Sequence, residues 1–304
     1  MGPERGSPTV SDEHRRLRWN LWAQEPAMST KRAVRAVVFT DLDATLLDHD
    51  SYDWSAAQDA LEALKSRGVP VCLCTSKTVA EVRALRRALG NRAPFATENG
   101  SIVAVPDGYF EGEFANDSEA EETLTCTTLG APYDRLRRLV VDLRARHGFD
   151  YTGFGDMSVA DVMAATGLDR EAAAAARQRD ASEPLLWQDS AAAETAFAQA
   201  VAEAGATTRR GGRFVHVLGL ADKGDALDWL RTRFEAVHGP ILAVALGDSA
   251  NDADMLAAAD IGWWVARPDG DYEAPAGGHI RHAEGIGPVG WSAAIHAMIE
   301  AGEI

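Results

Sequence analysis

Two acidic segments of the chain carry residues whose types and spacing could do chemistry. In the first, Asp41 and Asp43 stand two positions apart in DLDAT, directly after the apolar run AVVFT. Two carboxylates placed in this way can serve one small site, one as a nucleophile and the other as an acid and base if its neighbour raises its pKa. Taken alone, DLDAT could also be a capped turn, where aspartate is common.

The second acidic segment, GDSANDADM, begins at Gly247 and also follows an apolar run. Its Asp248 and Asp252 are four positions apart, and carboxylate oxygens suit a hard ion such as Mg²⁺, which takes one or two carboxylates and keeps several waters. Alone, this segment could be an Asx turn and a helix cap. Because both segments follow strand-like runs, together they favour one site at the edge of a sheet.

The elements that must position these acids alternate between strand and helix. Residues 36–40, 69–75 and 240–248 are short, apolar runs, which are typical of strands buried on both faces. Residues 55–68 and 78–90 each combine a capping residue, spaced apolar side chains and a terminal glycine, as helices do. This alternation predicts right-handed parallel crossovers and therefore an α/β fold, a Rossmann-like, doubly wound parallel sheet.

The length of 304 residues allows roughly two domains. Residues 122–218 mix strand-like and helical segments, which predicts an α+β cap domain inserted into the parallel domain. The catalytic core then consists of residues 33–121 and 219–304. Residues 1–32 are polar and lack a sustained apolar period, so we expect a tail outside the fold, with Met28 as a candidate start.

Composition limits the partners of the protein. Lys and Arg total 30 against 46 Asp and Glu, giving a formal net charge of −16, and such a surface repels nucleic-acid phosphates. The chain has three cysteines without a CxxC pair, and it has no long apolar run and no hydrophobic signal core. We therefore expect a cytoplasmic protein that binds neither nucleic acid nor a membrane. Cys72 and Cys74 are expected to be small core side chains. The sequence does not indicate an oligomeric state.

Four motifs, in the order in which they occur, resemble those of the haloacid dehalogenase superfamily of phosphatases. They are DLDAT after the first strand, Thr75 at the end of the second, Lys223 in ADKGDA, and the GDSAND segment. The resemblance implies that Asp41 attacks phosphorus to give an aspartyl-phosphate, and that Asp43 protonates the leaving oxygen and then activates water. It also implies that Thr75 holds the phosphoryl group and that Lys223 stabilises its charge, whereas Lys223 alone would be taken for a surface helix residue.

The same resemblance implies Mg²⁺ as the cofactor. Asp41 and Asp248 would be ligands, and Asp252 would bind directly or through water. The backbone carbonyl of Asp43 would supply another oxygen. An ion held there neutralises charge at the transferring group.

The inserted segment resembles the cap of the type IIB subgroup, which contains many sugar phosphatases. Further strings resemble the mannosyl-3-phosphoglycerate phosphatase family: DLDATLLDHDSYDW, CTSKT, ATENGS, GFGDMS, residues 178–184 and GGRFVHVLG. This resemblance implies hydrolysis of mannosyl-3-phosphoglycerate to mannosylglycerate, a compatible solute, with release of phosphate. The cap would choose the substrate and close over it.

These strings contain candidates for substrate binding. A glycerate carboxylate and a phosphate call for cationic donors, sugar hydroxyls call for polar side chains, and a loop with glycine can approach a ligand closely. For each candidate, a solvated, structural or plain turn role is the alternative. The cationic candidates are Lys77, Arg177, Arg179 and Arg213, the sugar-binding candidates are Ser182 and Glu183, and the loop candidates are Asn99 and Gly100.

One position departs from the family pattern, because Ala44 stands where the family usually has glycine. We expect Ala44 to adopt a negative φ, at which its methyl group is accommodated. His216 has no ligand pattern near it in the sequence and is given no role.

Three competing functions share these motifs. Another sugar phosphatase, for example one acting on glucosyl-3-phosphoglycerate or sucrose 6-phosphate, would have the same core residues. A phosphomutase would return the phosphoryl group to sugar, and a non-catalytic sensor would bind a sugar phosphate without turnover.

Overall fold

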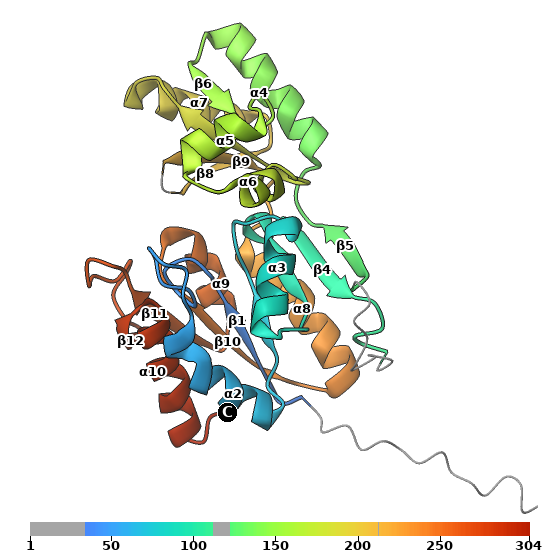
Figure 1. Ribbon diagram of the computed structural model, residues 1–304, viewed down its shortest axis with the longest axis vertical. Helices are drawn as coiled ribbons and strands as arrows, with labels where there is room; N and C mark the ends of the chain where they lie inside the picture. The colour runs from blue at the N-terminus through green and yellow to red at the C-terminus, as the bar shows by residue number, and fades with distance from the viewer. Residues whose placement is uncertain (1–33, 112–121, 212) are drawn as a thin grey trace, which may run out of the picture. The chain divides into compact units, whose positions relative to one another are not determined.

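The computed structural model describes residues 34–111, 122–211 and 213–304 (Figure 1). Residues 34–304 form one compact unit. The predicted tail with Met28, and residues 112–121 of the predicted core, lie outside the described residues.

The core is built on a five-stranded parallel sheet in which β1 lies between β10 and β2. All five residues of β1 are buried, as the apolar run predicts. This sheet confirms the predicted doubly wound α/β fold, whose strand order places the ends of β1 and β10 side by side. The strands, in spatial order, are β12 (Ile280–Ile286), β11 (Ile261–Ala266), β10 (Leu242–Gly247), β1 (Ala36–Thr40) and β2 (Val71–Leu73).

Helices cover both faces of the parallel sheet. Val38 of β1 packs in one hydrophobic cluster with side chains from α2 (Gln58–Arg67), α3 (Val79–Leu89) and α10 (Gly287–Glu300). Its neighbour Phe39 packs on the opposite face. There the cluster includes side chains of α8 (Lys223–His238) and α9 (Ala253–Ala258). Cys72 and Cys74 lie in this second cluster, and burial raises the pKa of the Cys74 thiol to about 12, so both cysteines are core side chains as predicted.

The helix predicted at residues 55–68 begins differently from the expectation. Its first turn is a 3₁₀ helix, η1 (Ser55–Ala57), and Ser55 bonds to the side chain of Asp53 through its amide and its hydroxyl. Ser55 therefore orders the loop before the helix and does not cap it.

A small antiparallel sheet extends the core beside β2. It contains β3 (Phe95–Thr97), β4 (Ile102–Pro106) and β5 (Leu124–Thr128), and a bridge between Cys74 and Ala96 connects it to the end of β2. The turn η2 (Glu98–Gly100) lies between β3 and β4. Every residue of β5 pairs with β4. We therefore move the proposed boundary of the cap, which the sequence analysis set at residue 122, to a point after Thr128.

The inserted segment forms an antiparallel sheet with its own core, as the prediction of an α+β cap requires. Helices α4 (Tyr133–His147) and α7 (Ala191–Glu203) pack on this sheet through side chains such as Val140 and Phe197. Helices α5 (Val159–Thr166) and α6 (Arg170–Ala176) form a second cluster around Val162. The strands, in spatial order, are β6 (Tyr151–Gly153), β7 (Ser182–Trp187), β9 (Phe214–Leu218) and β8 (Thr207–Gly211).

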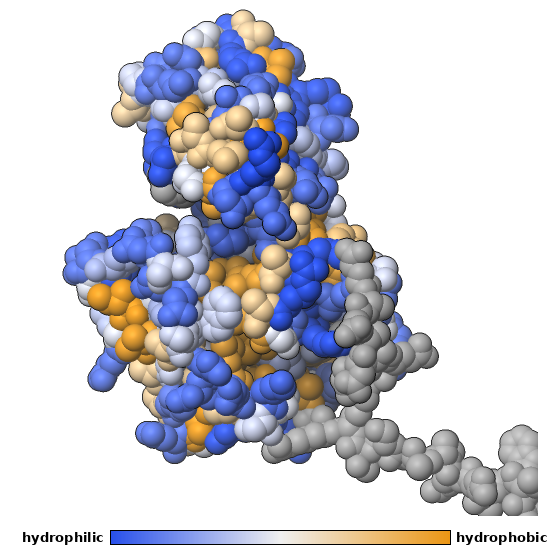
Figure 2. Space-filling model, in the orientation of Figure 1, coloured by the Kyte–Doolittle hydropathy of each residue, from blue (hydrophilic) through white to orange (hydrophobic). Residues whose placement is uncertain are grey.

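The described surface is largely hydrophilic on the face shown in Figure 2, with hydrophobic side chains in small separate areas. The same view shows a hollow between the cap and the core. Among the residues that the structure describes, no helix combines the length and the apolar character needed to cross a membrane.

Candidate active site

The site begins where β1 ends, at Asp41. The preceding strand is buried along its whole length, so the chain brings this carboxylate into the interior, where it is only 6% exposed. The ammonium group of Lys223, the first residue of α8, donates to Asp41 Oδ1 and to Asp252 Oδ1 at 2.6 Å each. Lys223 is fully buried. Burial alone would lower its pKa, but Asp252 and Asp41 outweigh that effect and raise it, so the lysine stays charged.

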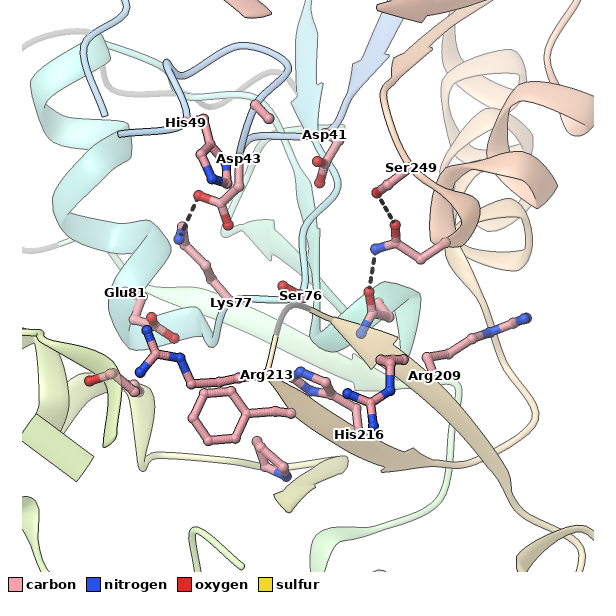
Figure 3. A pocket seen from close by; sticks show the side chains of 18 of the residues that line it. Asp41, Asp43, His49, Ser76, Lys77, Glu81, Arg209, Arg213, His216 and Ser249 are labelled. Atoms are coloured by element: carbon pink, nitrogen blue, oxygen red, sulfur yellow. Dashed lines mark hydrogen bonds and ion pairs between the residues drawn. The ribbon is translucent and has the colours of Figure 1, made fainter. Parts of the chain in front are cut away.

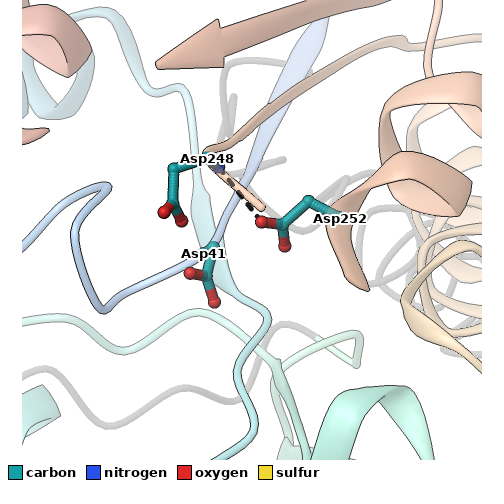
Figure 4. Close-up of side chains that lie close together, drawn as sticks. All are labelled: Asp41, Asp248 and Asp252. Atoms are coloured by element: carbon teal, nitrogen blue, oxygen red, sulfur yellow. Dashed lines mark hydrogen bonds between the residues drawn. The ribbon is translucent and has the colours of Figure 1, made fainter. Parts of the chain in front are cut away.

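Three buried carboxylates converge on this lysine. Oxygens of Asp41, Asp248 and Asp252 all lie within 4.8 Å of one another (Figure 4). Burial raises the pKa of Asp41 well above its ordinary value, and raises that of Asp248 to about 6 with a contribution from Asp252. Three acids against one ammonium leave an excess of negative charge, which a cation could neutralise.

The acids that follow β10 are held by their own loop. Asp252 Oδ2 accepts hydrogen bonds from the amides of Asp248 and Ser249, both at 3.1 Å. Gly247 permits this fold-back, because a Cβ atom at that position would collide with the Asp252 side chain. The hydroxyl of Thr45, from the loop after β1, donates to Asp248 Oδ1 at 3.1 Å and so ties the two acidic segments together.

Asp43 lies closer to solvent than Asp41, and its side chain is 38% exposed. Lys77 Nζ is 2.8 Å from Asp43 Oδ1 and 5.0 Å from the centre of the Tyr52 ring. Burial opposes the charge on Lys77, but its pKa is raised because Asp43 stabilises the ammonium form. The second acid of DLDAT is thus separated from the buried cluster and faces the space where a substrate can enter.

The expectation for Ala44 is wrong, since its φ is +59°. The amides of Thr45 and Leu47 both donate back to the carbonyl of Leu42, so the loop after β1 closes into a tight turn. Closing that turn places Ala44 in the left-handed region, where a residue with a Cβ costs about 1 kcal/mol. The chain tolerates at Ala44 the conformation for which glycine is usually chosen.

A cavity of about 580 Å³ lies between these loops and the cap (Figure 3). This volume is in the usual range for small-molecule sites. Figure 3 shows Asp43 and Lys77 joined on the core side, while Arg213 and His216 come from the cap segment around β9. The predicted site residues that the cavity brings together are Asp41, Asp43, Lys77, Asn99, Arg179, Arg213 and Asp248.

Seven predicted residues lie outside the described lining of this cavity: Lys223 and Asp252 of the buried cluster, the two sugar-binding candidates, and Thr75, Gly100 and Arg177. Thr75 is fully buried, and its hydroxyl accepts a hydrogen bond from the Lys77 amide at 3.2 Å, so it shapes the loop that carries Lys77. Gly100 does approach a neighbour closely, since a Cβ there would collide with the backbone of Asp222. Arg177 lies at the end of α6, where its amide donates to Ala173.

The two sugar-binding candidates are placed away from the cavity lining. Glu183 is fully buried and accepts hydrogen bonds from Tyr133 Oη and Arg137 Nη1, each at 2.7 Å, and from the Gly155 amide at 3.0 Å. Ser182 donates its hydroxyl to the side chain of Glu98. Because these groups already have protein partners, we withdraw Ser182 and Glu183 as sugar ligands.

His216 is a cavity residue that sequence reasoning missed. It is 8% exposed, and Nδ1 has no hydrogen-bond partner among the described residues. Burial, with a smaller contribution from Arg179, lowers the pKa of His216 to about 3, so the ring is neutral at neutral pH. An unpartnered, buried ring nitrogen in a cavity wall can bond a ligand.

Other missed residues lie inside the motif strings themselves. His49 and Tyr52 follow DLDAT, Ser76 lies in CTSKT, and Asn251 lies in GDSAND. Because these residues lie in or beside the motif strings, their sequence positions could have identified them as site candidates. The cap residues Arg209 and Arg210 also line the cavity but lie outside the strings, and nothing in the sequence distinguishes them from surface arginines.

Comparison with known proteins places the chain in a family. Residues 38–126 match the family model of haloacid dehalogenase-like hydrolases. A protein of Methanococcoides burtonii named glucosyl-3-phosphoglycerate/mannosyl-3-phosphoglycerate phosphatase is 38% identical over 267 residues, which cover 88% of this chain and 98% of that protein. The chain belongs to this phosphatase family.

A second relative agrees with this placement, and a solved structure shares the fold. A Persephonella marina protein of the same name is 35% identical over 266 residues, covering 86% of this chain and 97% of that protein. A phosphatase of the haloalkanoate superfamily from Bacteroides thetaiotaomicron shares the fold, with a TM-score of 0.59, 17% identity, and coverage of 92% of this chain and 100% of that one. This member of the family is a phosphoric monoester hydrolase, a sugar phosphatase of the haloacid dehalogenase superfamily.

Proposed function

We propose that this phosphatase hydrolyses mannosyl-3-phosphoglycerate to mannosylglycerate and phosphate, with Mg²⁺ and through an aspartyl-phosphate. The observation that carries the proposal is the pair Asp41 and Asp43 at one cavity, with Lys223 bonded to Asp41 at 2.6 Å. Glucosyl-3-phosphoglycerate is the second candidate substrate, because the names of both relatives contain both glycosides.

The chemistry assigns one aspartate to each role. A carboxylate oxygen of Asp41 attacks phosphorus, and the bond from phosphorus to the leaving oxygen breaks as Asp43 gives that oxygen a proton. The Asp43 carboxylate then takes a proton from water, whose oxygen attacks phosphorus and breaks the bond to Asp41. The ammonium of Lys223 favours the ionised form of Asp41 and stabilises the charge that gathers on the phosphoryl oxygens.

The residues present fit a magnesium ion. Asp41, Asp248 and Asp252 supply an oxygen-rich cluster with surplus negative charge, and Thr45 orients Asp248. The resemblance to the superfamily implies the backbone carbonyl of Asp43 as a further oxygen. When bound, the ion supplies charge neutralisation at the phosphoryl group.

The cavity fits a substrate that carries a carboxylate as well as a phosphate. Arg213 donates to the backbone carbonyl of Ala165 at 2.5 Å, which neutralises none of its charge. Lys77 lies across the cavity beside Asp43. Both cations can meet the glycerate carboxylate, while the neutral His216 ring offers a nitrogen to a sugar hydroxyl.

The test is phosphate release from mannosyl-3-phosphoglycerate, its glucosyl analogue, sucrose 6-phosphate and mannose 6-phosphate, each with Mg²⁺ or EDTA. We expect preference for the glycosyl phosphoglycerates, dependence on Mg²⁺, and a loss of about a thousandfold or more in Asp41→Asn. Asp228→Asn is the matched control, since it makes the same change on an exposed part of α8.

The other outcomes separate the competing functions. Activity confined to sucrose 6-phosphate or mannose 6-phosphate would keep the mechanism and reject the substrate. Conversion of mannose 1-phosphate to the 6-phosphate would indicate a phosphomutase. Binding of a glycosyl phosphoglycerate without turnover, in folded protein with Mg²⁺, would indicate a sensor.

A further inference from the structure

The turn η2 contains three consecutive residues in the left-handed region. The φ angles of Glu98, Asn99 and Gly100 are +51°, +57° and +88°. Two of these residues carry a Cβ, and each such residue costs on the order of 1 kcal/mol in this conformation. A turn of this kind persists only when its surroundings hold it firmly, so its contacts indicate what it is for.

The side chain of Glu98 leaves the core and binds the cap. It is fully buried, and its carboxylate accepts hydrogen bonds from the Asp180 amide at 2.8 Å, the Ala181 amide at 3.1 Å and the Ser182 hydroxyl at 2.5 Å. Asp180 and Ala181 belong to the short segment between α6 and β7 of the cap, and Ser182 is the first residue of β7. A carboxylate with three donors makes strong, charge-assisted bonds.

The segment that Glu98 binds directly follows Arg179, which lines the cavity. Arg179 Nη1 donates to the carbonyl of Ser76 at 2.9 Å and to the Ser182 hydroxyl at 3.3 Å. Ser182 therefore links the Glu98 carboxylate to the Arg179 guanidinium. Arg179 Nε also donates to the carbonyl of Ala176 at 2.9 Å, and Arg179 Nη2 lies 3.9 Å from Glu81 Oε2, so the contacts with Ser76 and Ser182 are two of those that place the guanidinium over the core.

The backbone of the same turn is bonded to the catalytic side of the cavity. The Glu98 amide donates to the carbonyl of Lys77, and the Asn99 amide donates to the carbonyl of Thr75, both at 2.9 Å. Asn99 Oδ1 also accepts from Asn251 Nδ2 at 2.9 Å. The backbone of the turn is thus bonded to the loop after β2, and the Asn99 side chain is bonded to the loop after β10. Because the turn is held in this way, Glu98 can hold the cap segment at a defined place relative to Asp43 and Asp41.

We propose that Glu98 is a positioning residue, which fixes the cap segment 180–182 and thereby sets Arg179 in the wall of the substrate cavity. The carboxylate acts through Arg179 and Ser182 and does not itself touch the substrate. This inference rests on the proposed function for its substrate, but the contact it describes exists without one.

The main test is Glu98→Gln, which keeps the size of the side chain but removes its charge and one acceptor oxygen. We expect KM for mannosyl-3-phosphoglycerate to rise about tenfold with a smaller change in kcat. For p-nitrophenyl phosphate, whose leaving group is too small to need the cap, we expect kcat/KM within about twofold of wild type. Glu183→Gln is the matched control, because that buried carboxylate has all its described partners inside the cap.

A second readout needs no substrate. Hydrogen exchange of the peptide that contains the Asp180 and Ala181 amides is expected to quicken about tenfold in Glu98→Gln and to stay near wild type in Glu183→Gln. If the protein proves inactive on all sugar phosphates, this measurement still tests the contact. Failure of the proposed function and failure of this inference are thus distinguishable.

Ser182→Ala approaches the same contact from the cap. Its effect on KM is expected to be smaller than that of Glu98→Gln, and the double variant is expected to be no worse than Glu98→Gln alone, since both remove one linkage. Three results would each overturn the proposal. They are equal losses of kcat/KM for mannosyl-3-phosphoglycerate and p-nitrophenyl phosphate in Glu98→Gln, unchanged hydrogen exchange of residues 180–182, and additive effects of the two substitutions on KM.

Discussion

Individual residues of the site owe their charge state to their buried neighbours. Lys223 remains charged in the interior because Asp252 and Asp41 more than offset the cost of burial. His216 shows the opposite case, because burial and a nearby arginine keep its ring neutral. One group is thus a fixed cation and the other a fixed neutral donor or acceptor across the physiological pH range.

The neutral state of His216 predicts a pH-dependent stability. Its pKa is about 3 in the folded protein and about 6.5 in an unfolded chain. Between these values the unfolded chain binds the additional proton, so the free energy of unfolding falls as pH is lowered from about 6.5 towards 3, by about 1 kcal/mol per pH unit. We expect His216→Gln, which does not titrate, to lose this part of the acid sensitivity.

Urea denaturation between pH 4 and pH 7 measures the effect. The exposed His147 supplies the matched control, so His147→Gln should keep the wild-type slope of stability against pH. Equal slopes in wild type and His216→Gln would contradict the assignment of a buried neutral ring.

Ala44 shows what a residue type alone does not determine. Alanine at that position predicted a negative φ, but the hydrogen bonds from Thr45 and Leu47 to the Leu42 carbonyl require the turn to close. Tertiary closure of the loop, including the bond from Thr45 to Asp248, outweighs the local preference of one methyl group.

At the scale of elements, Lys223 is the first residue of α8, so the start of this helix places the lysine in the site. Asp222 caps this helix, accepting from the Gly224 amide at 2.8 Å and the Asp225 amide at 3.0 Å. The side chain of Asp225 accepts from the Asp222 amide in return. This capping box fixes the turn of helix on which the lysine stands.

Loss of that cap should affect stability and turnover together. Asp222→Ala is expected to lower the free energy of unfolding by about 1 kcal/mol and to reduce kcat several-fold, because the backbone that carries Lys223 loosens. Asp222→Asn keeps an acceptor oxygen and should retain most of both. Chemical denaturation and steady-state kinetics check this, and a loss of stability with unchanged kcat would show that Lys223 is held by its ion pairs alone.

The elements also show which features of the site and the fold could be predicted from the sequence. Asp41 and Asp248 were predicted to share a site because parallel strands place their carboxyl ends at one edge, and the structure brings them together. Glu183 was misassigned because its partners Tyr133 and Arg137 come from a distant helix, which no local pattern reveals. The pairing of β5 with β4 was missed for the same reason, since the register of a long-range strand pair is set by tertiary contacts.

On the scale of the whole molecule, a chain with a formal charge of −16 must bind an anionic substrate. The cavity gathers Lys77, Arg179, Arg209, Arg210 and Arg213 at its walls, so local cations oppose the overall field. Asp43 and Glu81 also line the cavity, where they pair with Lys77 and Arg179, and the buried acids around Lys223 form a separate cluster. They concentrate negative charge at the place where a divalent cation would be most effective.

Binding of that cation should therefore stabilise the fold independently of activity. Saturating Mg²⁺ is expected to raise the melting temperature by several degrees and EDTA to remove the gain, because a ligand present at about 100 times its Kd adds about 2.7 kcal/mol. Asp248→Asn should abolish most of the Mg²⁺ effect. Asp254→Asn, an acid on α9 that pairs with Arg209 at 3.2 Å, should retain it.

Differential scanning fluorimetry with and without Mg²⁺ supplies the comparison. A melting temperature that is insensitive to Mg²⁺ in the wild type, or equally sensitive in Asp248→Asn, would count against a metal at this cluster.

The passage of the chain into and out of the cap has an evolutionary consequence. The outgoing segment passes through Gly130, and the returning segment runs so close to it that a Cβ on Gly219 would collide with the backbone nitrogen of Ala131. The two ends of the insertion therefore meet at one point, and a few residues could join them. An inserted domain whose own ends lie this near to each other can be gained, lost or exchanged there without moving a core strand. Substrate preference and phosphoryl chemistry can accordingly evolve in this family as separate modules.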